Sequence, residues 1–223
     1  MSNEANKTTE KKKGSLSPNV FLVLFIVITI AMFGISGFFI TKWVNKGVEV
    51  ATVGETKVHS NYYSFYIRET KNEMEEGSSL NSPEEKNTFW AMDRNIATAR
   101  ETTLKKIQRY VYLTNKANEE NVKMTLEQKK SLEDEYNEKY TEYKNELQDK
   151  YYLKTFGMKN DAYEKVMESI FIMNNYKELF IVKENITVEE FEIKVSEGIN
   201  SDSYKITLFE NISKKLEPDW QNN

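Results

Sequence analysis

The chain of 223 residues carries 31 lysine and arginine side chains against 35 aspartate and glutamate side chains, a formal net charge of −4 at pH 7. Residues 41–223 hold the acidic excess. This balance argues against nucleic acid as a partner, because phosphate binding needs a basic face. The absence of cysteine excludes disulfide bonds, thiol catalysis and a lipid anchor on a terminal cysteine.

A long apolar segment follows the polar start of the chain. Val20–Ile40 contains no charged side chain over 21 residues. At about 1.5 Å per residue it reaches about 31 Å, enough to cross the hydrocarbon core of a bilayer. A cleaved signal peptide is the main alternative, because Lys11–Lys13 precede the segment. The length of the apolar segment, and the lack of a small-x-small cleavage site after it, favour a transmembrane helix.

Lysines on both sides of this segment bear on its orientation. The cluster Lys11–Lys13 is denser than Lys42 and Lys46 on the other side, so we place the N-terminus in the cytoplasm and the large domain outside it. The expected organisation is a disordered cytoplasmic tail at 1–19, a transmembrane helix at 20–40, a linker at 41–47, a helical domain at 48–210 and a C-terminal tail at 211–223.

Composition and periodicity favour a mainly α-helical domain. The chain has 8 glycines and 3 prolines but 13 tyrosines and 12 phenylalanines, which disfavours a turn-rich sheet protein. Two segments alternate as strands do, Val48–Val53 and Tyr204–Phe209. A lone strand leaves its backbone groups unsatisfied. We therefore expect a small two-stranded element that pairs the start of the domain with its end.

Helical patterns fill the rest of the domain. Leu104, Ile107 and Val111 recur at helical spacing and predict a core-facing stripe. Thr187 and Glu190 fit a capping box. The expected helices begin near Ser60 and Pro83, span Glu127–Lys150, and begin again near Asp161 and Thr187.

The segment Glu127–Lys150 is the most charged, yet an apolar seam rich in tyrosine runs through it. The seam predicts one long amphipathic helix. A homodimeric coiled coil is an alternative, but the segment has too few heptads to favour it. The seam residues are Leu132, Tyr136, Tyr140, Tyr143, Leu147 and Tyr151.

No pattern of catalytic or metal-binding residues stands out. His59 is the only histidine, and it has neither a nucleophile elbow nor a spaced set of carboxylates beside it. No glycine-rich phosphate loop is present. We expect no catalytic residue, no cofactor and no metal site.

Several segments, in the same order, resemble the helical peptide-binding region of SurA- and PrsA-type extracytoplasmic foldases, which are chaperones linked to parvulin isomerase domains. The strand and turn Val50–Val58, followed by Tyr62–Tyr66, looks like the opening of that region. The later segments Thr103–Ile107, Thr155–Met158 and Ile186–Phe191 are similar to its following helices. The histidine-bearing parvulin domain has no counterpart in Asn200–Asn223. The helical anchor also departs from the lipid anchor common in PrsA-like proteins.

The resemblance implies a chaperone that holds unfolded or newly exported polypeptides without prolyl isomerase catalysis. The alternative is a non-enzymatic envelope scaffold that binds one fixed partner. A further alternative is an active prolyl isomerase. Oligomeric state stays open. A holding surface needs apolar, adaptable side chains. The candidates are Tyr62, Phe65, Tyr66, Phe89, Trp90 and Met92.

Overall fold

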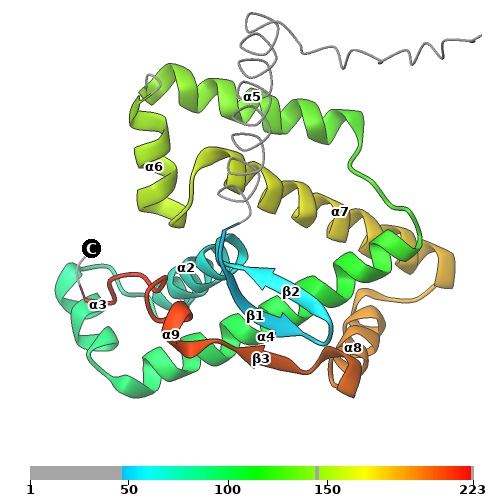
Figure 1. The fold of residues 1–223 in the computed structure, drawn as a ribbon, viewed down its shortest axis with the longest axis horizontal. Coiled ribbons are helices and arrows are strands. Elements are labelled where there is room, and N and C mark those ends of the chain that lie inside the picture. Colours follow the sequence, from blue (N-terminus) through cyan, green and yellow to red (C-terminus); the bar gives the residue numbers. More distant parts are fainter. Residues whose placement is uncertain (1–46, 144–145, 222–223) are drawn as a thin grey trace, which may run out of the picture. The chain divides into compact units, whose positions relative to one another are not determined.

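The computed structural model describes the backbone of residues 47–143 and 146–221, and the side chains of these residues apart from 140–149. They belong to a compact unit that spans Asn45–Asn223. Figure 1 shows a mainly helical fold with one small sheet. The elements in chain order are β1 (Glu49–Val53), β2 (Thr56–His59), α2 (Ser60–Gly77), α3 (Pro83–Trp90), α4 (Asp93–Glu119), α5 (Leu126–Tyr143), α6 (Glu146–Phe156), α7 (Asn160–Glu184), α8 (Val188–Ile199), the 3₁₀ turn Asp202–Tyr204, β3 (Ile206–Leu208) and α9 (Glu210–Ser213).

The sheet joins the start and the end of the domain, as the alternating segments predict. β1 pairs antiparallel with β3, with Ala51 opposite Leu208 and Val53 opposite Ile206. The expectation of two strands is wrong, because β2 pairs with the other edge of β1 and the order is β2-β1-β3. The turn from β1 to β2 depends on Gly54, whose φ is +56°. Glycine adopts this left-handed conformation without the steric cost of a Cβ atom.

The core lies where β1, α2, α4 and α7 pack together. Ile107 and Val111 of α4 are buried there, which confirms the predicted stripe. A second cluster forms further along α4, where Leu113 packs with Phe191 of α8. Because α4 contributes to both clusters, it holds the two parts of the core together.

Side-chain caps fix where two helices begin. The predicted capping box at Thr187 is confirmed: Glu190 N donates to Thr187 Oγ1 at 3.2 Å, and Thr187 N donates to Glu190 Oε2 at 2.8 Å. A second capping box, formed by Ser82 and Glu85, begins α3. α2 begins at Ser60, where the sequence predicts a helix start, and the Ser60 hydroxyl accepts from Val48 N at 3.1 Å.

The charged segment does not form the single helix expected over Glu127–Lys150. It forms α5, which ends at Tyr143, and α6, which begins at Glu146 and packs against α5. Figure 1 shows α6 turning away from the end of α5. The turn lets Tyr152 of α6 reach the core, where 1% of its surface is exposed.

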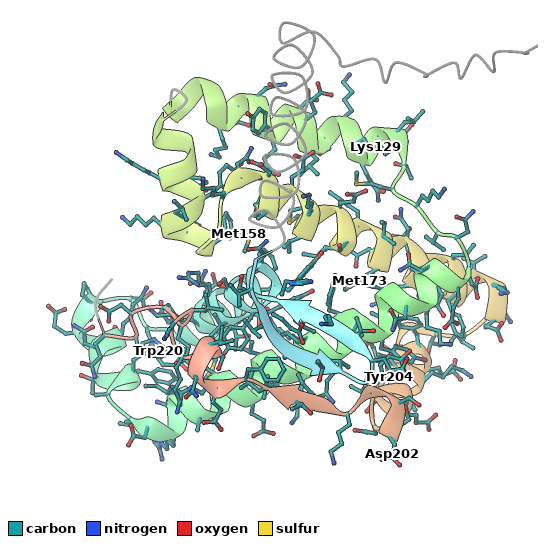
Figure 2. The ribbon with its side chains drawn as sticks, viewed as in Figure 1. Lys129, Met158, Met173, Asp202, Tyr204 and Trp220 are labelled. Carbon is teal, nitrogen blue, oxygen red and sulfur yellow. The ribbon has the colours of Figure 1, made fainter. Side chains whose placement is uncertain are left out.

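The C-terminal segment is packed, although we expected a tail from residue 211. Leu216 and Trp220 lie against the core cluster. Figure 2 shows Trp220 beside α3. The main chain of this segment is held by side chains of α2, because Arg68 Nη1 donates to Leu216 O at 3.1 Å and Lys71 Nζ donates to Asp219 O at 3.0 Å.

The predicted transmembrane segment Val20–Ile40 and the tail at 1–19 lie outside the described residues, as does nearly all of the linker. Among the helices from residue 47 onward that the structure describes, none is both long enough and apolar enough to span a bilayer. The membrane anchor therefore stays a prediction from the sequence.

Candidate functional site

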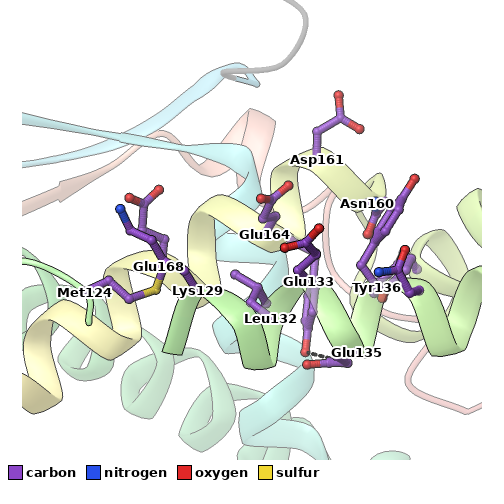
Figure 3. Close-up of a pocket in the computed structure, with 13 residues that line it drawn as sticks. Met124, Lys129, Leu132, Glu133, Glu135, Tyr136, Asn160, Asp161, Glu164 and Glu168 are labelled. Carbon is purple, nitrogen blue, oxygen red and sulfur yellow. Dashed lines mark hydrogen bonds between the residues drawn. The ribbon is translucent and has the colours of Figure 1, made fainter. Parts of the chain in front are cut away.

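A groove of about 650 Å³ lies between α5, α6 and α7 (Figure 3). We call it the α5–α7 groove. Its lining residues come from three helices and from the loop before α5, so only the folded domain assembles it. They are Met124, Lys129, Leu132, Glu133, Glu135, Tyr136, Asn137, Tyr152, Asn160, Asp161, Tyr163, Glu164 and Glu168.

The floor of the groove is aliphatic and aromatic. Leu132 of α5, Tyr152 of α6 and Tyr163 of α7 are all buried. Tyr136 lies one helical turn beyond Leu132 and is 38% exposed, so part of its side chain faces the groove and the solvent. Among the side chains of α5 that the structure describes, Leu132 is the only buried one. Of the two seam residues on α5 whose side chains the structure describes, Leu132 is therefore packed in the domain and Tyr136 is partly exposed.

Polar contacts hold α5 against α7. Near the start of α5, Gln128 Nε2 donates to Asn175 Oδ1 at 2.7 Å, and Asn175 Nδ2 donates to the Lys123 carbonyl at 2.9 Å. Further along, the Tyr163 hydroxyl donates to Glu135 Oε1 at 3.3 Å (dashed line in Figure 3). These contacts fix the groove at two points along α5.

The buried tyrosines of the floor keep their protons. Burial, and then the negative charge of Glu135, raise the pKa of Tyr152 to about 12. The same two causes raise the pKa of Tyr163 above its usual value. Both phenols therefore stay neutral hydrogen-bonding groups across the physiological range.

The rim of the groove is acidic. Five carboxylates, from α5 and α7, surround the floor, and Lys129 is the only cationic side chain among the described lining residues. The rim carboxylates are Glu133, Glu135, Asp161, Glu164 and Glu168. In the part of the chain that the structure describes, no group of three or more acidic or histidine side chains is arranged to hold a metal ion.

The α3 candidates from the sequence lie together, and one of them is deeply buried. Trp90 is 0% exposed, and its indole Nε1 donates to Glu75 Oε1 at 2.8 Å. Phe89 packs edge-on against Trp90 with ring centroids 4.9 Å apart. Met92 is 40% exposed and precedes the first turn of α4. Of these three, Met92 offers the most open surface.

The α2 candidates also contribute to packing. Phe65 and Tyr66 are buried, and burial raises the pKa of Tyr66 above its usual value. Tyr62 is half-buried and stacks on Tyr110 with centroids 4.4 Å apart. Phe65 and Tyr66 would have to leave the core to contact a client, and their predicted role in peptide binding stays a prediction.

Sequence reasoning did not identify the groove, although one signal for it was present. The seam residues Leu132 and Tyr136 belong to its lining. An apolar seam on a highly charged helix indicates a surface that is in contact with another apolar group. Periodicity alone does not say whether that group belongs to α7, to another chain or to a ligand.

No protein family model, curated protein or solved structure matches the chain.

Proposed function

We propose that the chain is a membrane-anchored, extracytoplasmic chaperone-like protein that holds unfolded or newly exported polypeptides in the α5–α7 groove without catalysing proline isomerisation. The observation that carries this proposal is the groove itself, with an aromatic and aliphatic floor, an open tyrosine and a polar rim. Sites for extended chains need apolar contacts that tolerate many sequences, and flexible or amphipathic side chains such as Met124 and Tyr136 supply them.

Two features of the sequence support the same function. The apolar segment Val20–Ile40 has the length and composition of a membrane anchor. The order of the strand, the turn and the following helices resembles the peptide-binding region of SurA- and PrsA-type foldases. Anchoring would tether the domain to the membrane, where exported chains first need protection.

An aggregation assay tests the holding function. The full-length chain, purified in detergent, is mixed with several unrelated chemically unfolded proteins, and light scattering is followed over time. We expect scattering to fall for all of them, and Tyr136→Ser to weaken the effect. Val182→Ser is the matched control, because Val182 is 80% exposed and lies outside the groove lining. Scattering that the wild-type chain leaves unchanged for every client would contradict the proposal.

A scaffold that binds one fixed partner is the second candidate. Leu179 and Val182 lie one turn apart on α7 and are 45% and 80% exposed. These two neighbouring apolar side chains are candidates for the contact with such a partner. The scaffold predicts that Val182→Ser abolishes binding of a single stoichiometric partner, while unrelated unfolded proteins are ignored.

An active prolyl isomerase is the third candidate carried from the resemblance. It predicts that the chain accelerates cis–trans isomerisation of a proline peptide. Our proposal expects the uncatalysed rate, measured with the same preparation that suppresses aggregation.

A further inference from the structure

Three carboxylates on the rim of the α5–α7 groove have no cationic partner among the side chains that the structure describes. Glu133 of α5 and Glu164 and Glu168 of α7 are exposed, and no described lysine, arginine or histidine forms an ion pair with them. Figure 3 shows carboxylates of both helices gathered around the same groove. The charge of one helix is therefore added to that of its neighbour.

By contrast, other carboxylates of the domain form ion pairs with lysine or arginine. Glu75 accepts from Lys86 at 2.8 Å, and Glu217 accepts from Arg100 at 2.8 Å. Glu192 Oε1 forms an ion pair with Lys177 Nζ at 3.0 Å. The described domain can thus place a cation beside a carboxylate, and it does not do so for Glu133, Glu164 and Glu168.

The arrangement on α7 is unfavourable for the helix itself. Glu164 and Glu168 are four residues apart, so their like charges face each other on one side of the helix. Neither lies in the first turn, where the helix dipole would stabilise a carboxylate. Helix stability therefore gives no reason for this pair, whereas a cationic ligand would relieve the repulsion.

The floor adds a second requirement to the ligand. Leu132 and Tyr163 are buried beneath the rim, and Tyr136 is 38% exposed. An aromatic ring binds apolar groups and also attracts a lysine or arginine cation over its face. A small cation alone would leave the exposed part of the Tyr136 ring uncovered, while a polypeptide segment with mixed side chains can contact both this ring and the carboxylates.

We infer that the α5–α7 groove selects polypeptide segments in which lysine or arginine alternates with apolar side chains, with the cations at the rim carboxylates and the apolar groups against Tyr136. This inference rests on the proposed function and names the class of client that the groove accepts. Charge complementarity raises the association rate and rejects acidic segments through repulsion. The attraction weakens with salt, because exposed charges are screened within about 10 Å at about 0.1 M ionic strength.

Peptide binding to the full-length chain, purified in detergent, tests the inference. Three fluorescein-labelled peptides share one leucine pattern and carry lysine, serine or glutamate at the alternate positions. Fluorescence anisotropy should rank their affinities as lysine, then serine, then glutamate. The lysine peptide should lose affinity as sodium chloride is added.

A triple variant, Glu133→Gln with Glu164→Gln and Glu168→Gln, should bind the lysine peptide about tenfold more weakly, as expected for three exposed charge pairs. The matched control is Glu55→Gln with Glu178→Gln and Glu197→Gln. It changes the net charge equally at exposed carboxylates that line no part of the groove. The control should bind as the wild type does, and circular dichroism and urea midpoints verify that both variants are folded.

The possible failures are distinguishable. Equal, salt-independent affinity for the lysine and serine peptides would overturn the charge selection, and the holding function would stand if aggregation is still suppressed. Loss of all peptide binding together with loss of aggregation suppression would overturn both. A concentration-dependent dimer that the triple variant dissociates would show that a second copy of the chain occupies the groove, and would also overturn the inference.

Discussion

Trp90 and Trp220 lie with their ring centroids 4.8 Å apart, which joins the end of the chain to the helix that carries the predicted binding cluster. Trp90 is fully buried, and Trp220 lies against the core with its Nε1 donating to Glu217 Oε2 at 3.1 Å. The cluster that sequence analysis favoured as a client surface is thus the place where the C-terminal segment closes the domain.

Replacing Trp90 should destabilise the fold severely. Trp90→Ala removes a large side chain that is 0% exposed and leaves Glu75 without the indole donor. Large-to-small changes of this kind cost about 3–5 kcal/mol. Urea denaturation followed by far-ultraviolet circular dichroism measures the loss. A decrease below about 1 kcal/mol would show that Trp90 is not a core residue.

The ion pair between Arg100 and Glu217 should hold the C-terminal segment. Arg100 Nε and Nη2 donate to the two carboxylate oxygens of Glu217 at 2.9 and 2.8 Å, and the Glu217 side chain is 7% exposed. Arg100→Ala removes the cationic partner of this buried carboxylate, which keeps the hydrogen bond from Trp220. We expect a loss of about 2 kcal/mol in the free energy of unfolding, below the full cost of a broken buried pair because Arg100 itself is 39% exposed.

The pair Glu101 and Lys105 provides the control for that prediction. Both side chains are largely exposed, and exposed pairs add little to stability. Glu101→Gln should leave the urea midpoint unchanged. An equal loss of unfolding free energy in Arg100→Ala and Glu101→Gln would mean that the burial of Glu217 does not strengthen its ion pair.

Acid should destabilise the domain partly through Glu75. Burial raises the pKa of this carboxyl, but hydrogen bonds from Lys86 and Trp90 and the charge of Lys71 outweigh it, so the pKa lies below the usual 4.5. A carboxyl with a lowered pKa in the folded state stabilises the fold above its unfolded pKa. That contribution is lost as the pH falls through the folded pKa. Glu75→Gln should therefore be less stable than the wild type at neutral pH.

The difference between wild type and Glu75→Gln should shrink as the pH falls below 4.5 and should vanish below the lower pKa of folded Glu75, where both proteins carry a neutral side chain at this position. Unfolding free energies measured across this range decide the point. A difference that stays constant from neutral pH to below that value would show that Glu75 is not charged in the folded protein.

Gly54 should be intolerant of a side chain. Its φ is +56°, and a Cβ atom there would clash with the carbonyl oxygen of Ser203. Its amide also donates to the Lys205 carbonyl at 3.0 Å, beside the β1–β3 pairing. Gly54→Ala should cost more than about 1 kcal/mol. Gly77→Ala is the control, because no atom lies within 4 Å of its Cβ position, and it should not lower the thermal unfolding temperature.

The sequence predicted those parts of the fold that depend on neighbouring residues. The capping box of Thr187 and Glu190 and the stripe through Ile107 and Val111 are local patterns, and the structure confirms them. The pairing of β1 with β3 was also predictable, since backbone groups of one alternating segment need a partner from another. β2 was missed because its four residues offer one buried apolar side chain, Val58.

Contacts between distant segments could not be predicted in the same way. Periodicity marked Phe89 and Trp90 as apolar but did not show that Trp220 covers Trp90. The acidic groove could not be predicted from the sequence either. Glu133 and Glu164 belong to different helices, and only tertiary packing brings them to one surface. The tyrosine seam indicated the surface, and the structure shows what surrounds it.

Photo-crosslinking from within the groove is the most direct test of the central claim that polypeptides are held between α5 and α7. A benzophenone-bearing phenylalanine is placed at Tyr136 or, separately, at Val182 on the exposed face of α7. Each protein is irradiated with an unfolded client rich in lysine and leucine. We predict crosslinks at position 136 that excess lysine peptide suppresses, with little product at position 182. Crosslinks at 182 alone, or no product at 136, would contradict the account.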